Sequence, residues 1–399
     1  MKNRLIVKNG KIIFPDKIEE HMTVVCENGK ITNILNNEEF TPGNSDIVID
    51  ATNKYIAPGF IDIHTHGGGG HDFMDGTVEA YLGAAETHAR YGTTALLPTT
   101  LTSTFEELLK TFSIYKEAVR NNYKGAKFLG LHLEGPYFAY NQRGAQDPKY
   151  LRNPEPEEYN KILSESDDIV RWSLAPELPG ALDFGKVLTS KNILTSIAHS
   201  DAIYEEVLDA FNAGFTHVTH LYSAMSTVTR RNALRYAGVL EAAYLIDDMT
   251  VEIIADGVHL PKSLLQFVYK FKGSDKTALC TDSMRGAGMP DGESILGSLE
   301  KGQKVIIEDG VAKLPDRTAF AGSVATTDRL VRTMVETAEV PLVEAVKMMT
   351  LTPARIMRID QQKGSIEKGK DADLVIFDSA IHVSHTISEG NVIFKNEKQ

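Results

Sequence analysis

Short apolar runs recur through the middle of the chain, and each one ends in a polar or reactive side chain. In the first run, apolar residues lead to His64 and His66, and four glycines follow. Stretches with the apolar spacing of helices separate these runs, and strands that alternate with helices favour parallel βαβ units. The eight runs cover residues 60–66, 93–100, 127–134, 170–177, 193–200, 216–220, 251–259 and 276–283.

The positions of the polar run ends predict the fold class. Reactive side chains at the carboxyl ends of eight parallel strands are typical of a (β/α)8 barrel, which places its active site there. We therefore predict an α/β protein with a TIM-like barrel. Its helices are expected at residues 77–91, 104–121, 155–164, 202–213, 262–270, 326–338 and 341–349.

Both ends of the chain show a second pattern, of short strands separated by turns. Asn9-Gly10 and Asn28-Gly29 are strong hairpin signals. A few strands at each end cannot easily bury a core alone. We therefore predict one small β-sandwich domain from residues 1–56 and 354–399, with the barrel inserted as residues 57–353. The connection over residues 286–319 should contain a small hairpin near 304–311.

Composition and charge restrict the possible partners. The 399 residues include 42 Lys and Arg against 54 Asp and Glu, a net charge of −12. This balance disfavours nucleic acid and anionic membranes, and an anionic substrate would need a local basic site. Cys26 and Cys280 stand far apart, which fits a reducing cytoplasm. No apolar run has the length of a signal peptide core or a membrane span, so we expect a cytoplasmic protein.

Five of the strand-end residues form a candidate metal site. Side chains alternate along a strand, so His64 and His66 point the same way. One such histidine alone would more often be a structural residue, but burying several ionisable groups together is costly without a cation. The expected ligands are His64, His66, Glu134, His199 and His220. A single catalytic zinc uses three protein ligands, so five predict one or two divalent ions, Zn or Fe first, with Glu134 bridging a pair.

Three further positions are candidates for substrate chemistry. Asp282 ends the eighth run and is the candidate general base, with a helix cap as the alternative. Arg230-Arg231 offers a bidentate anion clamp, or else a solvated helix start. His259 is a pocket residue, a second base or a core histidine. His71, His132 and His217 are taken as structural, and His217 should face away from His220 because three residues separate them.

These motifs resemble the family of N-acetylglucosamine-6-phosphate deacetylases within the amidohydrolase superfamily. The similarity runs from end to end, and His-Leu-Glu-Gly-Pro with Asp-Gly-x-His is fairly specific for it. Glu134 stands where dihydroorotase-like relatives have a carbamylated lysine. The motifs that carry the resemblance lie at residues 58–62, 132–136, 198–200, 219–222, 255–259, 281–282 and 321–323.

The resemblance implies roles for individual residues. Glu134, His199 and His220 would hold the main metal, while His64 and His66 would hold a second. In this family the arginine, here Arg231, reaches the sugar phosphate across the interface of a homodimer. The positions that match substrate contacts are Ala145, Gln146, Ser223, Ala224, Arg231, His259, Phe320, Ala321 and Gly322.

The implied reaction removes the acetyl group of N-acetylglucosamine 6-phosphate by metal-activated water, giving glucosamine 6-phosphate and acetate. Ser223 replaces an asparagine that is common in the family, and a hydroxyl cannot offer the two donors of an amide. Another N-acyl substrate, such as N-acetylgalactosamine 6-phosphate or an N-acyl amino acid, is therefore the alternative. A non-catalytic assembly protein is the remote alternative, because such a protein should have lost ligands.

Overall fold

A parallel barrel forms the centre of the molecule in the computed structural model, which describes residues 4–397. Its sheet follows the order β10-β9-β11-β12-β13-β14-β17-β18, and β6 pairs with β9. The predicted barrel is therefore confirmed, and all eight expected runs form its strands. Their bounds are Phe60–Thr65 (β6), Thr93–Thr100 (β9), Lys127–Phe128 (β10), Leu131–Glu134 (β11), Ile169–Leu174 (β12), Leu194–Ile197 (β13), Phe215–Val218 (β14), Thr250–Ile253 (β17) and Thr277–Leu279 (β18).

The ring closes between its last and first strands just at the carboxyl ends. The backbone N–H of Asp282 donates to the carbonyl of His64 at 2.9 Å. The hydroxyl of Thr281 donates to Asp62 at 2.5 Å on the same seam. This closure brings the residues after β18 beside those at the end of β6.

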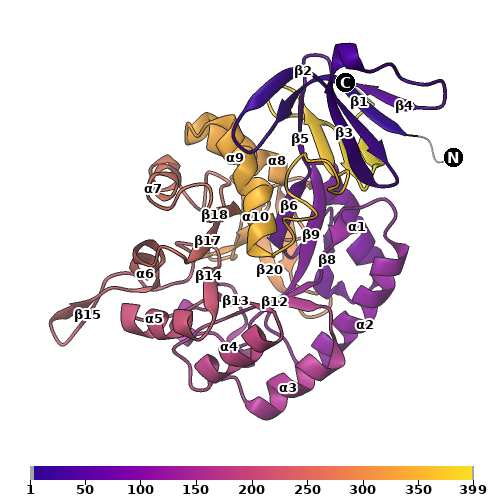
Figure 1. The fold of residues 1–399 in the computed structure, drawn as a ribbon. Helices are drawn as coiled ribbons and strands as arrows, with labels where there is room; N and C mark the ends of the chain where they lie inside the picture. The colour runs from indigo at the N-terminus through magenta and orange to yellow at the C-terminus, as the bar shows by residue number, and fades with distance from the viewer. Residues whose placement is uncertain (1–3, 398–399) are drawn as a thin grey trace.

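Helices surround the barrel (Figure 1). Their bounds are Val78–Ala89 (α1), Phe105–Asn121 (α2), Pro156–Glu165 (α3), Ala181–Ser190 (α4), Tyr204–Asn212 (α5), Val239–Leu245 (α6), Lys262–Lys272 (α7), Thr327–Arg332 (α8), Leu342–Met349 (α9) and Leu351–Ile356 (α10). α4, α6 and α10 were not among the expected helices. α4 contains Gly185, which disfavours a helix in sequence, but a side chain there would meet the ring of Phe215 at 2.3 Å.

Strands from both termini form one continuous mixed sheet beside the barrel, as predicted (Figure 1). Its order is β25-β24-β23-β5-β1-β2-β3, with β4 paired to β1. The proposed division after residues 56 and 353 stays a prediction, and its ends at 1–3 and 398–399 lie outside the described residues. The strands are Leu5–Ile13 (β1), Ile18–Glu27 (β2), Lys30–Asn36 (β3), Ile47–Asp50 (β4), Tyr55–Pro58 (β5), Leu374–Phe377 (β23), Val383–Ser388 (β24) and Asn391–Lys395 (β25).

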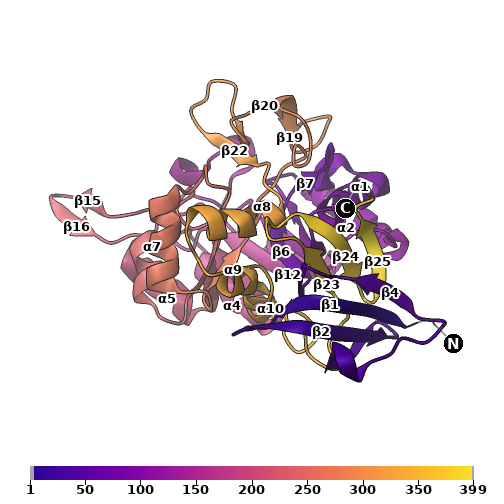
Figure 2. The same ribbon diagram turned by 90° about the horizontal axis from the view of Figure 1, so that it is seen from above.

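Two smaller β elements project from the barrel (Figure 2). The expected hairpin after β18 is part of a four-stranded antiparallel sheet, β19 (Gly292–Leu296), β20 (Gln303–Glu308), β21 (Val311–Lys313) and β22 (Phe320–Ser323). A separate arm consists of β15 (Thr229–Arg231) and β16 (Leu234–Tyr236). Short pieces complete the description: β7 (Gly67–Gly68), β8 (His71–Asp72), 3-10 turns at Asn37–Glu39, Phe73–Asp75, Tyr140–Gln142 and Pro148–Tyr150, and a π-helical turn at Thr333–Thr337.

Aromatic packing behind β11 fixes the segment that carries Glu134. Trp172 is fully buried, and its indole N–H donates to the carbonyl of Gly135 at 2.9 Å. The ring of Tyr137 stacks on Trp172 with a centroid distance of 5.9 Å. Large buried aromatic side chains contribute strongly to core stability, so the turn after Glu134 is held in place by the packing of these rings.

Within residues 4–397, no helix combines the length and apolar character needed to cross a membrane.

Candidate active site

The five expected metal ligands converge at the carboxyl ends of the barrel strands, and all are buried. Glu134 lies at their centre. Its Oε1 is 3.2 Å from Nε2 of His220 and 3.4 Å from Nε2 of His199. The same oxygen is 3.5 Å from Nε2 of His64, while Oε2 is 3.4 Å from Nε2 of His66. Two ligand triads result, each containing Glu134.

Hydrogen-bond partners on the far sides of the rings determine which nitrogen carries the proton. Nδ1 of His199 faces the carbonyl of Gln142 at 2.7 Å, and Nδ1 of His66 faces that of Thr99 at 3.2 Å. A carbonyl oxygen can only accept, so Nδ1 is the protonated nitrogen and Nε2 presents a lone pair. Both Nε2 atoms therefore point at the cluster as acceptors.

Several acceptor atoms thus face one another in a buried space. Nε2 of His199 and Nε2 of His220 are 3.3 Å apart, and Nε2 of His64 makes no hydrogen bond within the described chain. Converging lone pairs and a carboxylate repel one another unless a cation lies between them. The side chains therefore fit one or two divalent metal ions, with Glu134 shared by both triads.

Asp282 adds a second carboxylate at the edge of this cluster. Its Oδ1 is 3.1 Å from Nε2 of His66 and 3.4 Å from Nε2 of His64. Burial alone would raise its pKa, but a positive charge on His64 and a proton on Nε2 of His66 would lower the pKa of Asp282 below its usual range, and a cation in their place would act in the same direction. Its side chain still lines the open cleft. An ionised carboxylate in this position can accept a proton from a group bound beside the ligands.

The backbone at three of these positions is left-handed. φ is +48° at His199, +30° at His220 and +45° at Asp282. Such conformations cost on the order of 1–3 kcal/mol each for residues other than glycine, and they concentrate at functional sites. They turn the strand ends so that side chains reach the centre of the barrel mouth. At these three residues the side chains therefore do not alternate between two faces, as they would along a regular strand.

A cleft of about 400 Å³ opens above the ligands. Seven of the nine expected substrate positions line it. Arg231 and Ala321 do not, because Arg231 lies on the projecting arm and Ala321 is a fully buried residue of β22. The further lining residues were not predicted from the sequence: Leu101, Asn141, Gln142, Gly144, Tyr222, Ile254, Leu296 and Ala319. Most of these are apolar or loop residues without a distinguishing sequence signal.

Two of the expected substrate residues are fixed by neighbours. Nδ1 of His259 lies 2.8 Å from Asp256, and its ring centroid is 4.7 Å from that of Phe320. Burial raises the pKa of Asp256, but His259 outweighs it and lowers the pKa. Nε2 of Gln146 donates to Oε2 of Glu134 at 2.9 Å, and its Oε1 accepts from Thr102. The Gln146 amide therefore positions Glu134 in this structure.

Below the ligands lies an ion pair that sequence analysis did not identify. Arg171 of β12 and Glu252 of β17 are fully buried inside the barrel and 2.7 Å apart. Burial would raise the pKa of Glu252, but Arg171 and His64 hold it well below its usual range. The available signal was a charged residue in the middle of each of two apolar runs.

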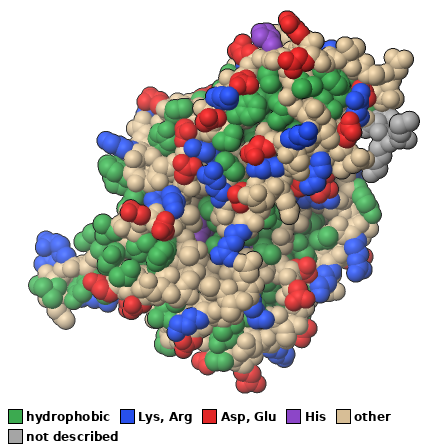
Figure 3. All heavy atoms as spheres, in the orientation of Figure 1, with side chains coloured by type: hydrophobic (Ala, Val, Ile, Leu, Met, Phe, Trp, Pro, Cys, Tyr) green, Lys and Arg blue, Asp and Glu red, His purple; other side chains and the backbone are tan. Residues whose placement is uncertain are grey.

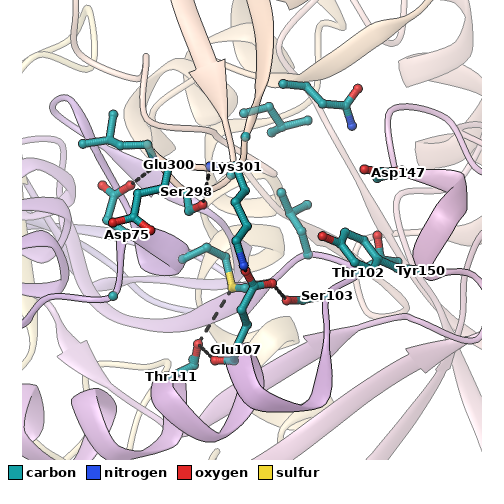
Figure 4. A pocket seen from close by; sticks show the side chains of 18 of the residues that line it. Asp75, Thr102, Ser103, Glu107, Thr111, Asp147, Tyr150, Ser298, Glu300 and Lys301 are labelled. Atoms are coloured by element: carbon teal, nitrogen blue, oxygen red, sulfur yellow. Dashed lines mark hydrogen bonds and ion pairs between the residues drawn. The ribbon is translucent and has the colours of Figure 1, made fainter.

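A second cavity of similar volume adjoins the cleft across Leu101, Ala145, Gln146 and Leu296 (Figure 4). Charged and hydroxyl side chains cross it, with Nζ of Lys301 2.7 Å from Glu107 and Ser103 also bonded to Glu107. Neither Asp282 nor any of the five predicted metal ligands lines this second cavity, so we place the chemistry in the first.

A barrel of this topology, with convergent histidines, a shared carboxylate and a free acidic group at the strand ends, defines a metal-dependent hydrolase. Comparison with known proteins gives the family. The chain belongs to the amidohydrolase family, whose sequence model matches residues 55–397.

Proteins similar to this chain over nearly its whole length are amino-sugar-phosphate deacetylases by name. N-acetylglucosamine-6-phosphate deacetylase of Bacillus subtilis is 33% identical over 99% of this chain and 98% of its own. N-acetylgalactosamine-6-phosphate deacetylase of Escherichia coli O157:H7 is 32% identical over 85% and 88%. The crystal structure of N-acetylglucosamine-6-phosphate deacetylase from Pasteurella multocida superposes with a TM-score of 0.90 at 30% identity, covering 98% of this chain and 100% of that one.

Proposed function

We propose that this protein hydrolyses the acetamide bond of N-acetylglucosamine 6-phosphate, releasing acetate and glucosamine 6-phosphate. The observation that carries the proposal is the convergence of Glu134 and four imidazoles with Asp282 at one cleft. The similarity to full-length deacetylases supplies the substrate class. A non-catalytic role is disfavoured, since the chain keeps all five predicted metal ligands and Asp282.

We assign the ligands as two overlapping sets. Glu134, His199 and His220 would hold the main ion, and His64 and His66 with Glu134 would hold a second. Zn or Fe suits this mixture of imidazole and carboxylate ligands. When bound, a divalent metal lowers the pKa of a coordinated water and polarises the acetamide carbonyl.

Asp282 moves the proton in this mechanism. Its carboxylate stands 3.1 Å from Nε2 of His66 and lines the cleft, so a water beside the ligands comes within its reach. Asp282 takes the proton from the attacking water at Oδ and returns it to the amine nitrogen as the C–N bond breaks. The neutral amine then leaves, and the acetic acid that remains loses its proton to give acetate.

The walls of the cleft hold the sugar. His259 donates Nδ1–H to Asp256, which leaves its Nε2 free for a substrate oxygen. Phe320 covers one side of this imidazole, and Ser223, Ala224 and Gly322 complete the wall. Ala145 also lines the cleft, while Ala321 remains an expected contact on the basis of its sequence position alone.

The arm of β15 and β16 suggests how the phosphate is bound. Arg231 is exposed there, lies over the ring of Tyr236 at 5.8 Å, and does not line its own cleft. Large hydrophobic side chains are exposed on and near the arm, and they gather over α6 in Figure 3. These are Val228, Leu234, Leu245, Phe267 and Phe271. Exposed apolar patches of this kind mark interfaces, so we propose a homodimer in which Arg231 enters the neighbouring cleft.

The cellular setting is also a proposal. Cys26 and Cys280 are both free and buried, and burial raises the pKa of Cys26 to about 12. Unpaired cysteines fit a reducing compartment. We therefore propose a cytoplasmic enzyme whose partner is a small amino-sugar phosphate.

A panel of three sugars tests the proposed activity. We expect kcat/KM to be highest for N-acetylglucosamine 6-phosphate, lower for N-acetylgalactosamine 6-phosphate and lowest for N-acetylglucosamine. A higher kcat/KM for N-acetylgalactosamine 6-phosphate would favour the alternative, deacetylation of that sugar. Ser223 and the similarity to the E. coli enzyme are the reasons to include it. Failure of the metal-loaded protein to release acetate from any of the three would contradict both.

Arg231→Ala should reduce kcat/KM for the phosphorylated sugar by roughly 10–100-fold, since a charge-assisted bidentate contact contributes about 1.5–3 kcal/mol. Hydrolysis of unphosphorylated N-acetylglucosamine should hardly change. Arg230→Ala is the matched control, because Arg230 is exposed on the same strand, and it should have much less effect. Equal losses on both sugars would show that Arg231 acts through folding or assembly.

Mixed dimers test whether Arg231 acts across the interface. A chain with Arg231→Ala and a chain with Asp282→Asn each lack one essential group. If Arg231 comes from the neighbouring subunit, co-refolding the two variants should restore activity at one site per mixed dimer. Mixing would give no recovery if Arg231 served its own cleft.

A further inference from the structure

The buried pair of Arg171 and Glu252 lies inside the barrel, directly below the metal ligands. Nη1 of Arg171 is 2.7 Å from Oε2 of Glu252, and Nη2 is 2.8 Å from Oε1. Both side chains have no exposed surface. Burying two charges is costly unless the pair is close and fully hydrogen-bonded, so its position calls for a functional explanation.

The remaining donors of Arg171 are fixed by the surrounding strands. Nη1 also donates to the carbonyl of Ile63 at 2.9 Å, Nη2 to Thr219 at 3.0 Å, and Nε to Ser196 at 3.2 Å. The guanidinium is therefore held by four strands of the barrel, and Glu252 is held by the guanidinium. The carboxylate has a defined position from which to orient a neighbour.

That neighbour is His64. Oε1 of Glu252 lies 2.8 Å from Nδ1 of His64. An ionised carboxylate can only accept, so Nδ1 carries the proton and the lone pair of Nε2 faces Glu134 and Asp282, at 3.5 and 3.4 Å. His66 and His199 instead face backbone carbonyls. Among the ligands, His64 alone has a charged partner behind it within the described chain.

We propose that Arg171 and Glu252 act as a positioning pair that makes His64 a ligand, and so set the affinity for the second metal ion. This inference rests on the proposed metal-dependent function. It names the residues that determine whether the site binds one metal ion or two. Partners behind metal-bound histidines fix the tautomer and the ring orientation, and losing one lowers metal affinity roughly 10–100-fold. The pair reaches the triad of Glu134, His199 and His220 only through the backbone N–H of His220, 3.4 Å from Oε1 of Glu252, among the described residues. No imidazole of that triad is oriented by the pair, so the main ion should be affected much less.

The same pair explains why a neighbouring group is not a further metal site. His64, Glu252 and Cys280 also lie close enough together to suit an ion. Arg171, however, already donates to both carboxylate oxygens of Glu252. The guanidinium serves as the cation of that group. Nδ1 of His64 and both oxygens of Glu252 are engaged in hydrogen bonds, so Cys280 alone is left as a ligand, which is too few for a metal site.

Metal titration of the full-length protein tests this inference. Wild type should bind two equivalents of Zn²⁺, and Glu252→Gln should bind the second roughly 10–100-fold more weakly while keeping the first. Bound metal is counted by elemental analysis at free Zn²⁺ concentrations set by a chelator buffer. Asp373→Asn is the matched control, because Asp373 forms a buried ion pair with Lys363 in the terminal sheet. It should keep both equivalents.

A second variant guards against misfolding of a chain with one unpaired charge. Replacing both partners, with Arg171→Met and Glu252→Leu together, removes the charges without leaving either one alone, and it should also lose the second equivalent. The inference is overturned if wild type binds a single ion, if both variants keep two with unchanged affinity, or if both ions are lost together. The metal counts do not depend on substrate, so they test this inference independently of the activity assay. A failure to release acetate would instead overturn the proposed function.

Discussion

Removing divalent metal should abolish hydrolysis of N-acetylglucosamine 6-phosphate by this protein. Nε2 of His199 and of His220 approach each other to 3.3 Å beside Glu134, an arrangement that suits a divalent cation. Asp282 could remove a proton from water, and a bound metal would polarise the acetamide carbonyl. Activity should return when Zn²⁺ or Fe²⁺ is added to the chelated protein.

The measurement is acetate release beside elemental analysis of the same sample. Circular dichroism of the chelated protein is the control that shows the barrel remains folded. The chelated protein should also melt at a lower temperature, since an ion that binds only the native state stabilises it by mass action. Full activity in protein shown to contain no metal would contradict the mechanism.

The sequence predicted the barrel well because its strands are short, apolar and bounded by polar residues. The run that ends at His64 and His66 is an example, and it forms β6 as expected. The three additional helices were harder to anticipate, because tertiary contacts decide them. Gly185 in α4 shows this, since its fit against Phe215 depends on a strand thirty residues away.

The five residues predicted as metal ligands converge in the structure, and their role as ligands stays a prediction. One argument made for this region was wrong. His217 was expected to face away from His220 on a regular strand. The structure instead brings Nε2 of His217 to 3.4 Å from Glu252, and the backbone of His220 approaches the same carboxylate. β14 ends at Val218, and the left-handed backbone at His220 turns its side chain back toward the centre.

The charged pair below the site could not be predicted from local pattern. Arg171 and Glu252 lie 81 positions apart, and each interrupts an apolar run in a way that resembles an edge or surface position. Only the closure of the barrel makes them neighbours. Arg231 is the reverse case, because the sequence predicted its role but one chain does not test it. The proposed role depends on a second subunit.

Asp282→Asn should lower kcat by roughly 10²–10⁴-fold, the range expected when a general acid–base group is lost. The amide matches the carboxylate in size and can still pack beside His64 and His66, but it cannot take a proton from water or return one to the amine. The loss arises in the transition state, so kcat and kcat/KM should fall together. Steady-state kinetics with N-acetylglucosamine 6-phosphate at saturating metal measure both.

Two controls make this result specific to proton transfer. The variant should bind as much metal as wild type, because Asp282 belongs to neither ligand triad. Asp147→Asn, at a carboxylate that lines only the neighbouring cavity, should leave kcat unchanged. If Asp282→Asn kept its metal and nearly its full kcat, Asp282 would not be the base. The proton would then have to be moved by another titratable group that lines the cleft outside the ligand sets, His259 or Tyr222.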